Sequence, residues 1–387
     1  MRTRGKAMEQ MEKCAILSIS LLLTTGLSVS SALPSMLNYY EGYSASQVEL
    51  LLSVPAIPSI ITIIFSAWLA SHIKERILVI TGLLLSGISG IVPFFNQGYS
   101  VVLISRIVFG FGIGLINAKA ISMISERYTG EEQTKLLGFR SSMEVLGNAG
   151  ATFIAGRLLV PGWHRAFLVY VLAFIILALY MIFVGDAYPQ TVFIKAEVEK
   201  TDGGQVRKII LFSLCGLFLV SVNVSDTMQI PLLVTRKIGG TEQEASVMLT
   251  VMMLSGAFSG LLFGKLSKGL KRFLPGVAMF GMAGGMTCIA FTEGILLLTI
   301  GTVLLGFSYT TVLTSVFSGL SRAFTENTLN TATSSVLVGC SVGAVLSQEI
   351  LKGIGSFDAS ADAPFKVFEI VLLAAGAVMI ACGLKRN

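Results

Sequence analysis

The chain has 387 residues, of which 53% are hydrophobic and only 13% are charged, and its net charge is +6. About a quarter of the residues of a soluble domain are charged, so this composition excludes a soluble globular protein. The basic residues are dispersed at the ends of apolar stretches instead of forming one basic face, and we therefore expect no nucleic-acid partner.

Twelve apolar stretches approach the length of a membrane-spanning helix, which is about 20 residues. They predict an all-α membrane protein with twelve transmembrane helices in a lipid bilayer. The predicted helices are 14–37, 48–70, 77–95, 101–123, 136–160, 166–184, 209–234, 245–266, 273–291, 295–320, 329–350 and 364–384.

The loops between these helices predict the orientation, because cytoplasmic loops carry an excess of Lys and Arg. With a cytoplasmic N-terminus, the inner segments hold nineteen Lys and Arg residues and the outer segments hold six. We therefore expect a multi-pass protein of the inner or plasma membrane with both termini in the cytoplasm, and we expect a monomer.

The first predicted helix, 14–37, contains hydroxyl side chains but no charge, and Asn38 follows it. Hydroxyl residues are common in membrane helices as packing residues, so any single one is more often structural. Taken together, Thr25, Ser28 and Asn38 predict one face of a substrate cavity.

The fourth predicted helix carries Arg106 inside an apolar stretch, followed by Gly110, Gly112 and Gly114. A guanidinium in hydrocarbon costs several kcal/mol and cannot lose its proton, so it persists only where it faces protein or water. This placement favours a polar pathway through a helix bundle. Lys119, later in the same helix, either extends its amine to the inner surface or lines the inner half of the path.

On the fifth predicted helix, Arg140 and Glu144 are four residues apart and therefore share a face. One interpretation is a local ion pair that lowers the cost of burying both groups. The other is that Glu144 is a protonatable site tuned by Arg140, Arg106 or Lys119.

The segment 186–208 is the only long polar stretch and predicts a cytoplasmic linker between two domains, 1–185 and 209–387. Beyond it, Asp226 lies in the outer half of the seventh predicted helix, close before Pro231. A buried carboxylate without a fixed cation favours its neutral form, which suits proton exchange. The alternative is a polar patch that bends the helix.

Further polar side chains on the seventh, tenth and eleventh predicted helices are candidates for the substrate cavity. Together with Lys119 and the residues of the first helix, the expected lining comprises Asn223, Gln229, Tyr309, Thr311 and Ser334.

The two halves of the chain repeat one another. Pro34 and Pro231 are separated by 197 residues, and so are Gly42 and Gly239. Capping boxes recur after the first and seventh predicted helices, formed by Ser44 with Gln47 and by Thr241 with Glu244. A parallel repeat of six helices predicts two pseudo-symmetric bundles with a site between them, which is typical of secondary transporters.

These patterns resemble the major facilitator superfamily over nearly the whole chain. Arg106 with its three glycines is similar to that family's buried-arginine motif, which is linked to proton coupling, and Gly162–Phe167 resembles the start of its sixth helix. Helix 5 has glycines near the antiporter motif but lacks its proline, and Ser71 replaces the usual Asp of the helix 2–3 loop. The resemblance implies two six-helix bundles and favours the bacterial drug/proton antiporter branch.

No Walker loop, metal cluster or nucleophilic triad is present in the sequence, so we expect no enzyme activity, metal site or cofactor beyond a proton gradient. The sequence predicts a proton-coupled transporter that exports amphipathic small molecules, with Asp226, Glu144, Arg106 and Arg140 as the coupling residues. The alternative is uptake or exchange of a small polar or anionic metabolite, with Arg106 as its ligand.

Overall fold

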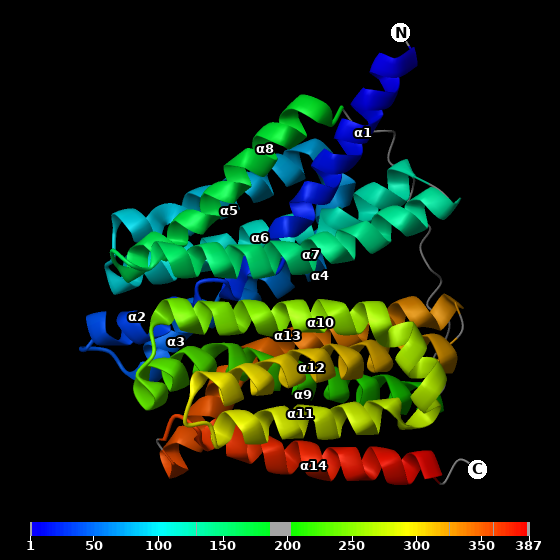
Figure 1. Cartoon of the computed structure of the whole chain (residues 1–387). Helices are drawn as coiled ribbons and strands as arrows, with labels where there is room; N and C mark the ends of the chain where they lie inside the picture. The colour runs from blue at the N-terminus through cyan, green and yellow to red at the C-terminus, as the bar shows by residue number, and fades with distance from the viewer. Residues whose placement is uncertain (1, 129, 186–202, 325, 359, 385–387) are drawn as a thin grey trace. The chain divides into compact units, whose positions relative to one another are not determined.

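The computed structural model describes residues 2–128, 130–185, 203–324, 326–358 and 360–384, and these residues contain helices but no strand. Two compact units divide the chain, Met1–Phe193 and Ile194–Asn387, here called the N-unit and the C-unit. Figure 1 shows the long helices of each unit running side by side.

The N-unit begins with a helix that is broken several times. Its pieces are α1 (Arg2–Ser18), η1 (Ile19–Leu22), η2 (Thr25–Leu27), η3 (Ser30–Ala32) and α2 (Leu33–Tyr39). The halves Met8–Leu22 and Thr25–Tyr39 are bent by 48°. The prediction of one continuous helix at 14–37 was therefore wrong in this respect: Ser and Thr hydroxyls compete for backbone groups there, and 3₁₀ turns replace the α-helical ladder.

The rest of the N-unit follows the predicted spans, although the second is divided at Val54–Pro55. The elements are α3 (Ala45–Ser53), α4 (Ala56–His72), α5 (Glu75–Phe95), α6 (Tyr99–Arg127), α7 (Gly130–Leu158), η4 (Trp163–Val171) and α8 (Leu172–Phe183). The predicted capping box is confirmed at α3, where Ser44 Oγ accepts the Gln47 N–H and the Gln47 side chain accepts the Ser44 N–H.

The described part of the C-unit contains six long helices with two short turns between them. They are α9 (Gly203–Leu233), the π-helical turn η5 (Val234–Ile238), α10 (Glu242–Leu270), η6 (Lys271–Phe273), α11 (Leu274–Ala290), α12 (Ile295–Ala323), α13 (Glu326–Phe357) and α14 (Ala363–Leu384). The second capping box, Thr241 with Glu244, is also confirmed. The helix α9 starts at Gly203, six residues earlier than predicted; the rest of the predicted linker, 186–202, lies outside the described residues.

Nine helices among the described residues are long and apolar enough to cross a membrane, or ten if the bent first helix counts as one span. One of these nine joins α10 and α11, and the charged helix α7 is not among them. Each of the twelve predicted stretches nevertheless coincides with a helix or a broken helix. The helices form an all-α membrane fold in which exposed apolar side chains are abundant, as lipid contact requires.

Candidate functional site

Arg106 is fully buried in α6 and donates hydrogen bonds to groups from three other elements. Its Nε reaches the Leu51 carbonyl oxygen at 3.0 Å, and its Nη2 reaches that of Gly26 at 2.5 Å. Its Nη1 lies 3.2 Å from the hydroxyl oxygen of Tyr170 in η4. Among the described residues Arg106 has no carboxylate partner, so its charge is held by carbonyl dipoles.

Aromatic rings enclose the same guanidinium. The Cζ atom of Arg106 is 4.8 Å from the ring centre of Phe109, 5.6 Å from that of Tyr170 and 5.7 Å from that of Phe167. Aromatic faces attract a cation most strongly where water is excluded. The rings and carbonyls together supply what water would supply to an exposed arginine.

The break in the first helix provides two of the carbonyl groups in this arrangement. The Tyr170 hydroxyl donates to the Thr25 oxygen at 3.0 Å, while Arg106 bonds the Gly26 oxygen. Backbone groups freed by a break in a membrane helix must find partners from neighbouring helices. Arg106 and Tyr170 fill that role, and sequence reasoning had missed Tyr170, which lies three residues beyond the recognised stretch Gly162–Phe167.

The glycines after Arg106 permit close packing of α6 against its neighbours. A Cβ at Gly110 would overlap the Pro55 backbone, one at Gly112 would overlap Ser86, and one at Gly114 would overlap Thr62. Small residues allow backbones to approach in membrane helices. The glycine pattern therefore serves the packing that surrounds the buried charge.

The predicted cavity residues of the first helix have different environments. Thr25 and Ser28 are buried, and their hydroxyls donate to the Leu22 and Thr25 carbonyl oxygens of their own helix. Asn38 is exposed near the end of α2.

Arg140 and Glu144 form an ion pair on α7, with Nη1 and Oε2 separated by 3.2 Å. Their side chains are 12% and 24% exposed, so the pair is partly withdrawn from solvent. The structure brings these two predicted residues together but does not bring Arg106 into contact with either. Lys119, on α6, is buried and interacts with another residue.

Asp226 lies seven residues before the end of the C-unit helix α9 and is 1% exposed. Neither of its carboxylate oxygens has a hydrogen-bond partner among the described residues. The neighbouring hydroxyls are engaged elsewhere: Ser225 donates to the Ser221 oxygen and Thr227 to the Asn223 oxygen, both at 2.8 Å. Asp226 is thus a buried and isolated acidic group.

The remaining predicted cavity residues are spread over three helices of the C-unit. Gln229 is buried and Asn223 is half-buried on α9. On α12 Tyr309 is half-buried, whereas Thr311 is buried with its hydroxyl oxygen 2.5 Å from that of Ser259. Ser334 on α13 is exposed.

Charged clusters occur at the helix ends, and the sequence reasoning did not identify them. In the N-unit, Arg127 is 4% exposed and pairs with Glu12 at 2.6 Å and Glu75 at 2.8 Å, which ties α6 to α1 and α5. In the C-unit, Glu369 on α14 accepts a hydrogen bond from Thr287 on α11. A carboxylate inside the apolar stretch 364–384 was the available signal for Glu369.

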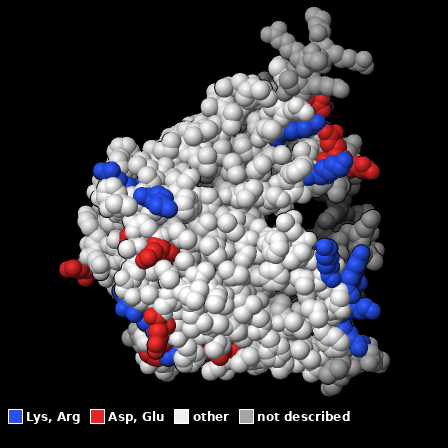
Figure 2. Space-filling model, in the orientation of Figure 1, with Lys and Arg blue, Asp and Glu red and all other residues white. Residues whose placement is uncertain are grey.

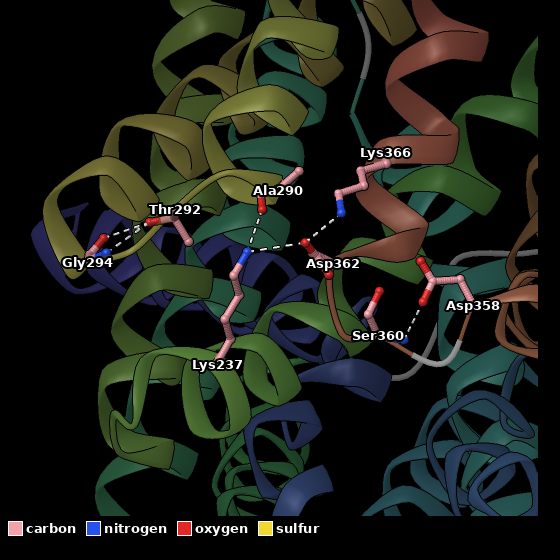
Figure 3. Close-up of polar contacts among 8 residues, drawn as sticks. All are labelled: Lys237, Ala290, Thr292, Gly294, Asp358, Ser360, Asp362 and Lys366. Carbon is pink, nitrogen blue, oxygen red and sulfur yellow. Dashed lines mark hydrogen bonds and ion pairs between the residues drawn. The ribbon is translucent and has the colours of Figure 1, made fainter.

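A further cluster, the Asp362 cluster of Lys237, Asp362 and Lys366, joins three segments of the C-unit (Figure 3). Asp362 Oδ2 is 3.3 Å from Lys237 Nζ and 3.0 Å from Lys366 Nζ, and Lys237 also donates to the Ala290 oxygen at 2.6 Å. Burial alone would raise the pKa of Asp362, but hydrogen bonds from Lys366, Ser360 and Lys237 lower it to about 2. The cluster therefore stays charged at physiological pH and is not a pH switch.

Comparisons with known proteins agree with this architecture. The family model described as Major Facilitator Superfamily matches residues 15–348. The structure is similar to a crystal structure of a D-xylose-proton symporter, with a TM-score of 0.77 and 16% identity, covering 95% of this chain and 96% of that one. It is also similar to an inward-facing and occupied bacterial homologue of the human lysosomal transporter Spinster, with a TM-score of 0.76, 16% identity and coverage of 99% and 97%. No curated protein matches the sequence.

Proposed function

Because this chain belongs to the major facilitator superfamily and is a membrane transporter, we propose that it is a proton-coupled secondary active transporter that exports amphipathic small molecules by alternating access. The coupling residue is Asp226, and the Arg140–Glu144 pair is the second candidate group. The energy source is the proton gradient.

The observation that carries this proposal is the isolation of Asp226. Burying an ionised carboxylate without a partner costs several kcal/mol, so the group is stable there only when it is neutral. When the site opens to water, hydration stabilises the ionised form of Asp226 and the proton can leave. A group that alternates between these states couples proton movement to the opening of the site.

The environment of Arg106 supports a substrate without a fixed negative charge. Its three donating nitrogens already bond Leu51, Gly26 and Tyr170, and three rings surround it. An anion would have to displace the carbonyl oxygens of Leu51 and Gly26 from Arg106, and the Gly26 group of the broken first helix would then lose its donor. We therefore favour a structural role for Arg106 within the transport cycle over that of a substrate ligand.

The proposal is tested in proteoliposomes by recording internal pH after adding lipophilic cations or small organic anions. We expect cations to trigger proton movement in the wild type, and Asp226→Asn to abolish it while substrate binding is retained. Glu369→Gln is the matched control, because Glu369 is a membrane carboxylate that already has a hydrogen-bond donor. Its proton movement should stay within about twofold of the wild type, far less than the tenfold loss that 1.4 kcal/mol would cause.

Proton movement triggered only by an anion, and surviving Asp226→Asn, would refute the proposal. Such a result would instead support uptake or exchange of an anionic metabolite, and loss of binding in Arg106→Ala would then identify Arg106 as its ligand. Equal loss in Asp226→Asn and Glu369→Gln would also count against a special role for Asp226.

A further inference from the structure

Four basic residues gather where α10 ends and α11 begins in the C-unit. This α10–α11 basic cluster consists of Lys265, Lys268, Lys271 and Arg272, all of which are exposed. None of the four forms an ion pair with a described carboxylate, although Arg272 lies over the ring of Phe273 at 5.1 Å. Figure 2 shows blue side chains without red ones over this part of the C-unit.

Few acidic residues lie near the cluster in the sequence. From Ala245 to Arg322 the only acidic residue is Glu293. It follows α11, and a helix of 17 residues separates it from the cluster by about 25 Å, at 1.5 Å per residue. Arg207 and Arg322, at the beginning of α9 and the end of α12, add further positive charge at the same end of the unit, and Glu326, the first residue of α13, adds one negative charge there.

In the N-unit, two basic side chains at helix ends have carboxylate partners. There Lys13 pairs with Glu9 and Glu132, and Arg127 pairs with Glu12 and Glu75. These two basic side chains at that helix end are thus neutralised within the protein. The unpaired cluster of the C-unit is not required by the repeat, and its charge remains available to a partner.

The backbone supports this interpretation at Lys271. Among the described residues, Lys271 is the only non-glycine residue with a positive φ, at 47°. Such a conformation strains a residue that has a side chain, whereas glycine adopts it without cost. A lysine at a position that favours glycine indicates that its charge has a use.

Apolar side chains adjoin the cluster and restrict the type of partner. Leu261 is 81% exposed and lies four residues before Lys265 and seven before Lys268, so the three share one face of α10. Leu270 is 37% exposed beside Lys271. Basic residues next to exposed leucines at the end of a membrane helix fit the boundary between acyl chains and charged headgroups.

We propose that the α10–α11 basic cluster is a binding surface for anionic lipid headgroups, such as phosphatidylglycerol. The headgroup phosphate lies among the ammonium and guanidinium groups, while the acyl chains lie along the exposed leucines of α10. The proposal concerns lipid recognition and does not depend on which substrate is transported.

The test measures lipid preference at the cluster itself. Leu270→Trp introduces a fluorophore, and the protein is reconstituted in phosphatidylcholine vesicles containing phosphatidylglycerol, with either lipid brominated in its acyl chains. The quenching by each brominated lipid is measured with and without the new Trp, and the difference reports contact of that lipid with position 270. The ratio of these differences gives the relative association constant of the two lipids at the cluster. We expect phosphatidylglycerol to be favoured about fivefold or more, which corresponds to the contribution of a single basic residue at an anionic surface.

The decisive variant replaces all four residues of the cluster by Gln, and the preference should then fall to about one. The matched control replaces four exposed basic residues elsewhere, Lys135, Arg157, Arg165 and Lys352, with the same change of charge and should keep the preference. Lys271→Gly provides a variant that folds readily: it should keep or raise the melting temperature, because it relieves the positive φ, yet lower the preference.

Three results would overturn the proposal. The first is equal quenching by the two lipids in the wild type. The second is an equal loss of preference in the control variant, which would indicate a general effect of net charge. The third is abolition of the preference by inorganic phosphate at concentrations that leave bulk screening unchanged, which would indicate a site for free anions.

Discussion

At the scale of single residues, the most demanding feature is the burial of Arg106 without a counter-charge. Its guanidinium bonds two backbone carbonyl groups and one phenol, and three rings enclose it. The Tyr170 hydroxyl accepts from Arg106 and donates to Thr25, so it satisfies two groups at once. Removing that single oxygen leaves the buried Arg106 Nη1 without this acceptor, whereas the Thr25 oxygen keeps the Ser28 hydroxyl and the Ser28 N–H as donors.

Tyr170→Phe should therefore destabilise the protein by about 1–3 kcal/mol, the usual cost of leaving a buried polar group unsatisfied. Thermal denaturation of the purified protein in detergent measures the loss. Tyr99→Phe is the control, because the Tyr99 hydroxyl donates to the Gln47 oxygen at an exposed position. A loss as large in the control as in Tyr170→Phe would contradict the assigned role.

The sequence identified the charged residues of the candidate site but did not identify the groups that they contact. A charged residue inside an apolar stretch can be recognised from the amino-acid sequence alone, which is why Arg106 and Asp226 could be identified. The acceptors of Arg106 are backbone oxygens of other elements, and carbonyl groups carry no sequence signal. The expected association of Arg106 with Glu144 was not found in the described structure, because both groups found partners within closer reach.

At the scale of helices, glycines let pairs of helices approach until their backbones touch. In the N-unit a Cβ at Gly147 of α7 would overlap the Leu21 backbone. In the C-unit a Cβ at Gly343 of α13 would overlap the backbone of Leu217 in α9. Both members of each pair are separated from their counterparts by 196 residues, so the two contacts are equivalent in the repeat.

Gly147→Ala and Gly343→Ala should each destabilise the protein by about 1–3 kcal/mol, as overpacking of a close contact does. Gly150→Ala in α7 and Gly260→Ala in α10 are the controls, since apart from the chain neighbours and the nearby backbone of the same helix no atom lies within 4 Å of a Cβ built at either position. These controls should be neutral or stabilising by up to about 1 kcal/mol, because alanine is the better helix former. The denaturation midpoints of the four variants are compared with that of the wild type. An equal shift in all four variants would refute the packing argument.

Helix positions were predictable from sequence because a span of apolar residues has one physical solution in a bilayer. The break inside the first helix was not predictable from the sequence, since the same apolar composition fits a straight helix and a broken one. At the break, Arg106 and Tyr170 bond the Gly26 and Thr25 carbonyl oxygens from other elements, in addition to the Thr25 and Ser28 hydroxyl bonds within the helix itself. Hydropathy contains no information on such tertiary partners.

At the scale of the whole molecule, the distribution of charge predicts how the chain lies across the membrane. The α10–α11 basic cluster and the Arg127 ion pairs occupy helix ends that the excess of Lys and Arg assigns to the cytoplasm. Lys352, near the end of α13, belongs to a segment assigned to the opposite side.

This orientation is tested by single cysteines in a background without the five native ones. In intact cells, Lys352→Cys should react with a thiol reagent that cannot cross the membrane, whereas Lys271→Cys should react only with a permeant one. Both positions are exposed, so the difference in labelling reports the side of the membrane and not burial. The reverse pattern would place both termini outside the cytoplasm.

The two halves also differ in what they have kept since duplication. The glycine contacts at Leu21 and Leu217 are equivalent, whereas Glu75, which pairs with Arg127, has Arg272 as its counterpart 197 residues later. At these positions the backbone contact is therefore the same in both halves, whereas the charge at the helix end is reversed. Matched packing inside the two halves leaves the chemistry of their ends free to differ, so one end holds a carboxylate paired within its unit and the other a guanidinium without a described carboxylate partner.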